Sequence, residues 1–190
     1  MAVCTYIVSK DIQGNCSNPI FGGLEQIGYL INRGDIASFT KTSGIVSAIA
    51  LKTGAKAVTV QQMGQQAFNG TSAELQQGDV MNTFNKVGSF IILDNSPDVT
   101  EKIVNPLANG EFVLILENKY KDSTSKNAFE IIGLDRGCRA TAITQNKYEN
   151  MGGWQVELTE TETPNASTFF WDTDYATSKA ALEALLIPAV

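Results

Sequence analysis

Apolar and polar residues alternate at a period of two along much of this chain, a pattern typical of half-buried β-strands. The clearest case is residues 154–161, WQVELTET, where Trp154, Val156 and Leu158 share one face. A continuous apolar run at 111–118 predicts a strand that is buried on both faces. Further strands are predicted at residues 24–31, 44–51, 57–62 and 80–93, with a short apolar edge strand within 165–174.

Glycine-containing segments divide these strands. Residues 44–62 are predicted to form a hairpin that turns at Gly54, and the dipeptide Asn69-Gly70 predicts another hairpin turn. Within 80–93 the alternation breaks at Gly88 into the run FIIL. We expect a bulge or a sharp bend there, because glycine inside a strand often marks one.

Residues 96–110 have the signals of a helix. Ser96 is placed to cap it and Pro97 to begin it, while one apolar face is formed by Val99, Ile103 and Leu107. Pro106 strains the last turn, so we expect the helix to end before Asn109-Gly110.

The last part of the chain predicts a second helix. It is capped near Asp172 to Asp174, carries Ala181, Leu182, Leu185 and Leu186, and stops before Pro188. Because strands do not alternate with helices, a parallel sheet is not expected. The sequence therefore predicts a mainly β fold: an antiparallel sandwich or barrel of seven to nine strands, with one central and one C-terminal helix. Residues 1–23 are predicted to form an N-terminal arm and residues 24–190 a single domain.

Composition narrows the function. Of the 190 residues 43% are hydrophobic, which is enough for a core, and the net charge of −6 leaves no basic stripe for nucleic acid. The absence of histidine removes the commonest general base and metal ligand. We therefore expect a protein that is not an enzyme, with no catalytic, cofactor-binding or metal-binding residue and no cofactor. The apolar runs are far shorter than the ~20 residues of a membrane span.

The N-terminal segment and the cysteines indicate a cytoplasmic origin. MAVCTYIVSKDIQGN has neither the basic region nor the apolar stretch of a signal peptide. Cys4, Cys16 and Cys138 are odd in number and form no CxxC pair. Neither a disulfide framework nor a zinc site is expected.

The segment FEIIGLDRGCRATAI, residues 129–143, invites a chemical interpretation. Gly133-x-x-x-Gly137 is neither a dinucleotide-binding motif nor a P-loop, and no helix follows it. A hairpin turn in which Gly137 supplies a positive φ is the favoured interpretation. Arg136 and Arg139 flank Cys138 and would lower its pKa, but a structural thiol is expected in the absence of a base.

Three acidic or charged motifs have structural alternatives. Asp172 and Asp174 offer oxygen ligands to a divalent cation, although a helix cap is favoured. The acidic run of Glu157, Glu160 and Glu162 could supply the paired carboxylates of a glycoside hydrolase. A solvated strand face is the favoured interpretation of this run. The tripeptide Arg33-Gly34-Asp35 spells an adhesion motif and is attributed to chance.

Three segments together resemble a known family. They are NPIFGGLEQIGYLINRGDI, DNSPDVTEKIVNPLANGEFVLILENKYK and NAFEIIGLDRGCRATAI, the last followed by GGWQVELTETE. In this order they are similar to tail-tube-fold virion proteins of tailed phages that infect gut Bacteroidota, crAss-like phages among them. The similarity covers about residues 18–172. Cys138 stands where an apolar residue such as Leu is expected.

The resemblance implies a virion protein, made in the host cytoplasm and located in the tail or neck. Such a protein self-assembles into homo-oligomeric rings, commonly of six subunits or a multiple, and contacts neighbouring tail, neck or portal proteins. DNA passes through the channel without specific binding, and an acidic wall reduces friction with phosphates. No membrane and no catalytic residue is implied. The arm and the polar loops at 64–79 and 118–127 are expected to form subunit contacts.

Two other functions stay open. A small-molecule- or glycan-binding β-barrel would use exposed aromatic side chains to stack on sugars, namely Tyr148, Trp154, Trp171 and Tyr175. An enzyme that uses carboxylates ranks last.

Overall fold

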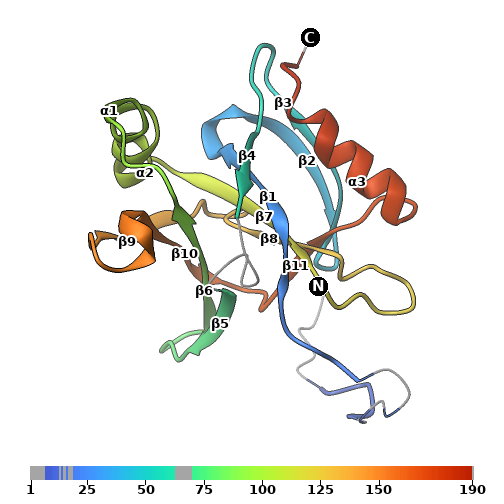
Figure 1. Ribbon diagram of the computed structural model, residues 1–190. Coiled ribbons are helices and arrows are strands. Elements are labelled where there is room, and N and C mark those ends of the chain that lie inside the picture. Colours follow the sequence, from blue (N-terminus) through green and yellow to red (C-terminus); the bar gives the residue numbers. More distant parts are fainter. Residues whose placement is uncertain (1–6, 13, 15, 17–18, 63–69, 190) are drawn as a thin grey trace.

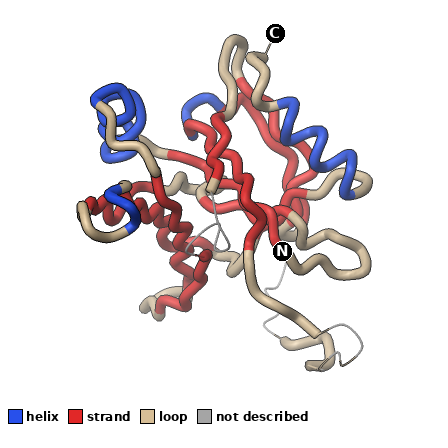
Figure 2. Tube along the Cα trace, viewed as in Figure 1, coloured by secondary structure: helices blue, strands red, loops and turns tan. Residues whose placement is uncertain are grey.

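Two β-sheets make up most of the fold (Figure 1), and Figure 2 shows the helices at their periphery. The computed structural model describes residues 7–12, 14, 16, 19–62 and 70–189. Sheet A has seven strands in the order β2-β3-β11-β8-β7-β1-β4, and sheet B has four in the order β5-β6-β10-β9. The strands are β1 (Leu24–Asn32), β2 (Ile36–Thr42), β3 (Ile45–Leu51), β4 (Val58–Gln61), β5 (Gly70–Gln76), β6 (Thr83–Ile92), β7 (Phe112–Asn118), β8 (Phe129–Ile132), β9 (Arg139–Gln145), β10 (Trp154–Thr163) and β11 (Thr168–Phe170).

The helical segments are short. A central one comprises α1 (Pro97–Val99), the wide π-helical turn η2 (Thr100–Val104) and α2 (Asn105–Asn109), and the terminal one is α3 (Tyr175–Ala184). Two single 3₁₀ turns are η1 (Arg33–Asp35) and η3 (Asn150–Gly152). The predicted mainly β class with two helices is confirmed. Among the described residues neither sheet closes into a barrel, since sheet A ends at β2 and β4 and sheet B at β5 and β9.

The order of strands in sheet A departs from the sequence prediction in two places. Strand β2 was not predicted, and it pairs antiparallel with β3. Strand β11 is not an edge: it lies between β3 and β8 and is parallel to β3, with Phe170 beside Val46. One parallel pair therefore enters an otherwise antiparallel sheet, because the chain returns to sheet A only after completing sheet B.

Both predicted hairpins of the first half are placed differently. Residues 44–62 do not form a hairpin, because β3 pairs with β2 and β11 whereas β4 pairs with β1. Asn69 lies outside the described residues, and Gly70 begins β5, which pairs with β6 from Gly70–Ser89 to Gln76–Thr83. The turn of that hairpin is therefore at residues 77–82. Long-range pairing, and not the local glycines, decides these connections.

Strand β7 is buried on both faces and separates two cores, as its apolar run predicts. Val113 and Ile115 belong to the first core, on the concave side of sheet A that α3 covers. Leu114 and Leu116 belong to the second core, between sheet A and sheet B. All four side chains are 0% exposed. The molecule is therefore a sandwich with a helix on its outer side.

Gly88 lies where the two sheets approach each other, and no bulge occurs there. Its pairings with Leu158 on β10 and Thr71 on β5 fall in an unbroken register. A Cβ at this position would come within 2.7 Å of Leu114 Cδ2 and 3.2 Å of Ile132 Cδ1. The glycine is required by close packing of the sheets and not by a bend.

The central helix begins as predicted and runs further. Ser96 Oγ accepts a hydrogen bond from Val99 N at 3.4 Å, and Pro97 is the first helical residue. Pro106 does not end the helix, which continues to Asn109. Proline has no N–H with which to bond the preceding turn. The turn before Pro106, η2, is a wider π-helical turn in which Asn105 N donates to Thr100 O, five residues earlier.

Helix α3 is capped by Asp174, which accepts a hydrogen bond from Thr177 N at 2.8 Å. Leu182 is 0% exposed and inserts into the first core beside sheet A. Leu185 O accepts a hydrogen bond from Ala57 N at 2.7 Å, just before β4. The helix is thus held along one side of the concave face.

Candidate functional site

The glycine segment at 133–137 is a corner between the sheets and not a hairpin. It joins β8 of sheet A to β9 of sheet B, which do not pair with each other. Gly133 and Gly137 have φ values of 90° and 80°, and Gly137 N donates to Gly133 O at 2.9 Å. A Cβ on Gly133 would lie 2.4 Å from Phe112 O. The expected positive φ at Gly137 is confirmed, while the hairpin is wrong.

Cys138 ends this corner as a buried thiol. Its Sγ donates to Phe112 O at 3.0 Å, and the two residues also exchange backbone hydrogen bonds of 2.8 and 2.9 Å. Burial, followed by the charge of Glu160, raises the pKa of the thiol to about 12. The expectation that Arg136 and Arg139 lower this pKa is therefore wrong. A neutral, inaccessible thiol is neither a nucleophile nor a metal ligand.

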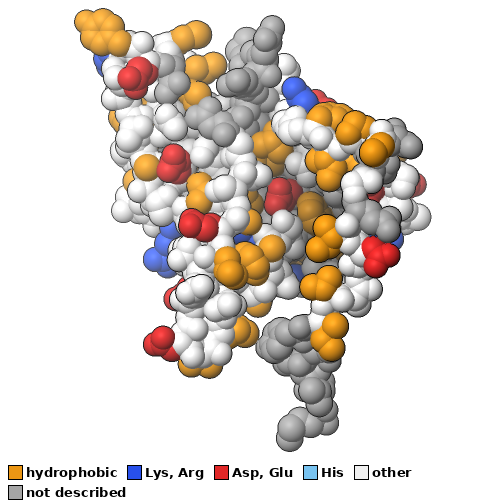
Figure 3. All heavy atoms as spheres, turned by 90° about the horizontal axis from the view of Figure 1, so that it is seen from below, with side chains coloured by type: hydrophobic (Ala, Val, Ile, Leu, Met, Phe, Trp, Pro, Cys, Tyr) orange, Lys and Arg blue, Asp and Glu red, His pale blue; other side chains and the backbone are white. Residues whose placement is uncertain are grey.

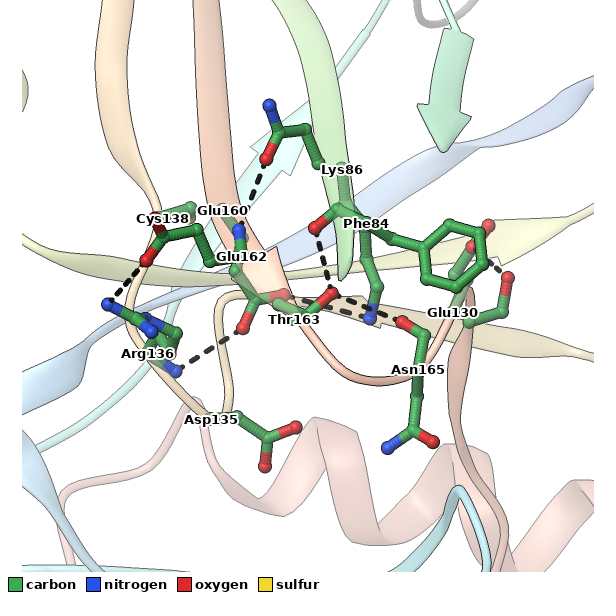
Figure 4. A network of polar contacts seen from close by, with 12 residues as sticks. Phe84, Lys86, Glu130, Asp135, Arg136, Cys138, Glu160, Glu162, Thr163 and Asn165 are labelled. Carbon is green, nitrogen blue, oxygen red and sulfur yellow. Dashed lines mark hydrogen bonds and ion pairs between the residues drawn. The ribbon is translucent and has the colours of Figure 1, made fainter. Parts of the chain in front are cut away.

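Next to Cys138, an ion pair is buried in the second core (Figure 4). Lys86 on β6 and Glu160 on β10 are cross-strand neighbours, with Lys86 Nζ 3.7 Å from Glu160 Oε2 and both side chains 2% exposed. Glu160 Oε1 also accepts a hydrogen bond from Arg136 N at 3.3 Å, at the glycine corner. The interpretation of Glu160 as part of a solvated face is wrong.

The rest of the acidic run is more exposed. Glu157 is half-buried, and Glu162 forms an exposed ion pair with Arg136 at 3.2 Å. Glu162 has a positive φ of 56°, because an extra residue bulges out of β10 between Glu160 and Thr163. The bulge separates Glu162 from the buried Glu160. These carboxylates do not converge on a cavity as a glycosidase pair would.

The other charged motifs are also structural. Asp174 caps α3, and Thr177 N, then Thr177 Oγ1, lower its pKa by donating hydrogen bonds to it. Asp35 accepts a hydrogen bond from Asn32 Nδ2 at 2.9 Å within the turn η1. Among the residues described, no group of three or more Cys, Asp or Glu is arranged to hold a metal ion.

The four aromatic residues considered for glycan binding do not form a platform. Trp154, Trp171 and Tyr175 are partly buried, and only Tyr148, at 99%, is exposed. The Tyr175 ring stacks on Phe129 with centroids 5.7 Å apart, and its hydroxyl donates to Glu117 at 2.6 Å. The ring and the hydroxyl of Tyr175 therefore both contact other residues of the protein.

An apolar groove of about 600 Å³ lies beside the edge of sheet A. Three elements line it: the β1–β4 edge of sheet A, the end of β6, and the central helix. The helix face predicted from Val99, Ile103 and Leu107 points here, with Ile103 40% exposed. Other apolar side chains of the lining are Leu30, Val58, Val60, Phe90, Ile92 and Leu93.

The edge strand β4 borders this groove. In the described chain, β4 pairs only with β1, so its other edge is free of a strand. The described pairing of β5 with β6 reaches Ser89, and the side-chain amide of Gln62 is hydrogen-bonded to β6 at Ile91. Gln62 Nε2 donates to Ile91 O at 2.8 Å, and Ile91 N donates to Gln62 Oε1 at 2.9 Å. The groove is thus bordered by the outer edge of β4, where Gln61 O accepts a hydrogen bond from Gln62 Nε2 at 3.2 Å.

The N-terminal arm also carries apolar side chains, but they project into solvent and do not line a groove. Its described residues have no regular secondary structure, and its apolar side chains are exposed: Ile7 75%, Val8 80%, Ile12 94%, Ile20 82% and Phe21 56%. The base of the arm contacts the domain through the Phe21 ring, which packs against the Tyr120 ring, and through Gly23 O, which accepts a hydrogen bond from Lys119 N at 3.0 Å. The sequence predicted an N-terminal arm at residues 1–23. It gave no signal for the groove.

Charge is spread over the face of the molecule that Figure 3 shows. On the face seen in Figure 3, acidic side chains are scattered and basic ones do not gather into a patch. Within the described residues no helix is long and apolar enough to cross a membrane.

The described part of the chain is therefore a β-sandwich with an apolar groove and an exposed apolar arm. Comparison of the chain with protein-family models, curated proteins and solved structures finds no match.

Proposed function

We propose that this chain is a structural protein of a phage virion, which self-assembles into rings of the tail tube or neck. Genomic DNA and ejected proteins would pass through the channel of these rings without specific binding. The observation that carries the proposal is the exposed apolar arm, whose five large apolar side chains are 56% to 94% exposed. A stable monomer rarely leaves such a surface in water, and contact with another subunit removes it.

The sequence similarity to tail-tube-fold virion proteins supplies the particular assembly. Its most specific segment contains the glycine corner at 133–137, where two positive φ values and close approach to Phe112 require glycine. Cys138, which departs from the expected apolar residue, is buried like one. The segment therefore has a structural role in the subunit, in keeping with a shell protein that needs no reactive group.

Electron microscopy and light scattering of the purified full-length protein test the proposal. We expect ring-shaped particles with a central channel, and a mass of six subunits or a multiple. Replacing Ile7, Val8 and Ile12 by Ser is expected to shift the protein towards monomer while its melting temperature is retained. The matched control replaces the exposed Tyr148 and Ile187 by Ser, which lie outside the arm. A protein that stays monomeric at high concentration contradicts the proposal.

A second candidate function is binding of a small apolar molecule in the groove. Its volume of about 600 Å³ falls within the range of ligand pockets, and its lining is largely apolar. Glycans are less suited, because three of the four aromatic residues considered are partly buried. Titrations with long-chain fatty acids and with a glycan panel, monitored by tryptophan fluorescence, test the binding of an apolar ligand and of a glycan. Saturable binding of the fatty acid by a protein that forms no rings would favour this second function.

A further inference from the structure

We infer that a second, charged pocket of this chain binds the phosphate group of a small organic phosphate. The pocket is lined by residues of β1, of β7 and the loop after it, and of α3, and it shares no lining residue with the apolar groove. Figure 1 shows the start of α3 beside the loop that follows β7. The inference goes beyond the proposed ring function and does not depend on it.

The pocket continues the face of sheet A that carries the first core. Along β7, Val113 and Ile115 belong to that core. At the same period of two, Glu117 and then Lys119, just after the strand, follow on this face and line the pocket. The apolar core therefore gives way to charged side chains at this end of the sheet.

Glu117 is the buried acid of the pocket, with its side chain 6% exposed. Tyr175 Oη donates a hydrogen bond to Glu117 Oε1 at 2.6 Å, and Lys121 Nζ lies 3.0 Å from the same oxygen. Lys179 Nζ lies 3.6 Å from Glu117 Oε2. The two ammonium groups also lie 5.4 and 5.9 Å from the centroid of the Tyr175 ring, within the range of a cation–π contact. The carboxylate and the ring thus hold both lysines at the pocket.

Positive charge exceeds negative charge in this pocket, although the whole chain carries a net charge of −6. Lys119, Lys121 and Lys179 line it together with two acids, the buried Glu117 and the 43% exposed Glu25. In the part of the chain that the structure describes, Lys119 has no carboxylate within ion-pair distance. Burial opposes the charge of Lys179, but Glu117 outweighs it and the pKa of Lys179 is raised, so this lysine stays charged at neutral pH.

The lysines keep hydrogen-bond donors for a ligand. Lys121 Nζ donates to Asn118 O at 2.8 Å and contacts Glu117, which leaves one of its three N–H groups. Its distance to Glu25 Oε1, 3.8 Å, is too long for a hydrogen bond. Lys119 is exposed, and the side chain of Lys179 is 39% exposed. An anion can therefore meet three ammonium groups without removing Glu117 from its partners.

The lining and the size of the pocket favour an organic phosphate. A phosphate ester carries about −1.5 to −2 charges at pH 7, whereas a simple carboxylate carries one, and lysine is a common phosphate ligand. Three lysines against one buried carboxylate match the higher charge better. The volume of about 470 Å³ is in the range of small-molecule pockets and exceeds what a bare phosphate ion fills. Ile27, 42% exposed, and the Tyr175 ring offer apolar surface to the organic part.

Isothermal titration calorimetry of the full-length protein, at neutral pH and constant ionic strength, tests the site. The probe is phenyl phosphate, and inorganic phosphate and benzoate are the comparisons. Lys119→Met and Lys179→Met remove one charge each while they keep the length of the side chain. The matched controls are Lys52→Met and Lys147→Met, at exposed lysines outside the pocket. A thermal melt of each variant checks that it is folded.

We expect one saturable site for phenyl phosphate and weaker binding of both comparison anions. Each pocket variant should weaken binding about ten-fold, as the loss of a charged hydrogen bond does, and each control should change it by less than about two-fold. Glu25→Gln should strengthen binding, because it removes an opposing charge from the pocket. This variant decides the question if a lysine variant does not fold.

Three results would overturn the inference. They are the absence of saturable binding at millimolar phenyl phosphate, an equal loss in the pocket and control variants, and benzoate binding as tight as that of phenyl phosphate. Rings that form in a protein without this binding leave the proposed function standing. Binding by a protein that forms no rings supports the inference and contradicts the ring function.

Discussion

The two faces of sheet A are packed by different chemistry. The first core, under α3, is built from apolar side chains such as Ile115, Phe129 and Leu182. The second core, between the sheets, places the buried ion pair of Lys86 and Glu160 close to Cys138. Apolar packing tolerates sliding, whereas a buried pair satisfies its charges in one arrangement only. The second core therefore combines apolar packing with a polar network that joins β6 and β10 of sheet B to the glycine corner through Arg136 N.

The strongest test of this difference is the removal of one charge from the second core. Glu160→Leu leaves Lys86 buried without a partner, and we expect a loss of about 3–5 kcal/mol in the free energy of unfolding. The double variant Lys86→Met, Glu160→Leu should recover most of it, since both charges are then absent. Urea denaturation measures the three proteins. The control is Glu162→Leu on the same strand, whose ion pair is exposed and should matter by less than about 1 kcal/mol. A single variant as stable as the control would remove the distinction between the cores.

A cavity in the first core should lower the free energy of unfolding without leaving a charge unpaired. Ile115→Ala removes a fully buried side chain from the middle of β7, and we expect a loss of about 2–5 kcal/mol. No second substitution of a charged partner should rescue it, in contrast to the Lys86–Glu160 pair. Denaturation in urea again provides the measurement. Recovery upon Lys86→Met would show that the two cores are not separate.

The boundary between sheet A and sheet B is probed at Gly88. Its missing side chain leaves room for Leu114 and Ile132, so Gly88→Ala should overpack the second core and cost about 1–3 kcal/mol. Shortening Leu114 to Val in the same protein should restore part of the stability. A thermal melt of each variant gives the comparison. If Gly88→Ala is neutral, the sheets are not in close contact there.

The smallest effect concerns the thiol in the second core. A thiol reagent should label Cys16 rapidly in the native protein, because it is exposed, and label Cys138 only after unfolding. The pKa of Cys138 is raised from 9.0 to about 12, so the stability that its protonated form contributes is present below pH 9 and declines as the pH rises towards 12. Unfolding at pH 8 and pH 10 should differ less in Cys138→Ala than in the native sequence. Rapid labelling of Cys138 without unfolding would show that the second core opens.

Local signals predicted the elements better than their partners. The apolar run of β7 correctly indicated burial on two faces, and Ser96 and Asp174 cap helices as predicted. Strand pairing could not be obtained this way, because β4 joins β1 across 25 intervening residues between Asn32 and Val58. Strand β2 was missed because residues 36–42, IASFTKT, mix polar and apolar positions at a sheet edge.

The candidate sites were less predictable. A signal for Glu160 did exist, since a period of two from Val156 and Leu158 places it on the buried face. The prediction placed Glu160 on a solvated face because it is charged. Lys86, its buried partner, lies at an inward position of β6. The groove had no local signal, because it is made by three segments that meet only in the folded chain.

The position of β11 in the middle of sheet A has a consequence for biosynthesis. The strand that completes the sheet, Thr168–Phe170, is the last to leave the ribosome, and without it β3 and β8 have no neighbour between them. The chain has by then passed from sheet A to sheet B and back twice, so its contacts are largely non-local and folding is expected to be slow. Chains that have not yet added β11 would therefore lack a continuous sheet A.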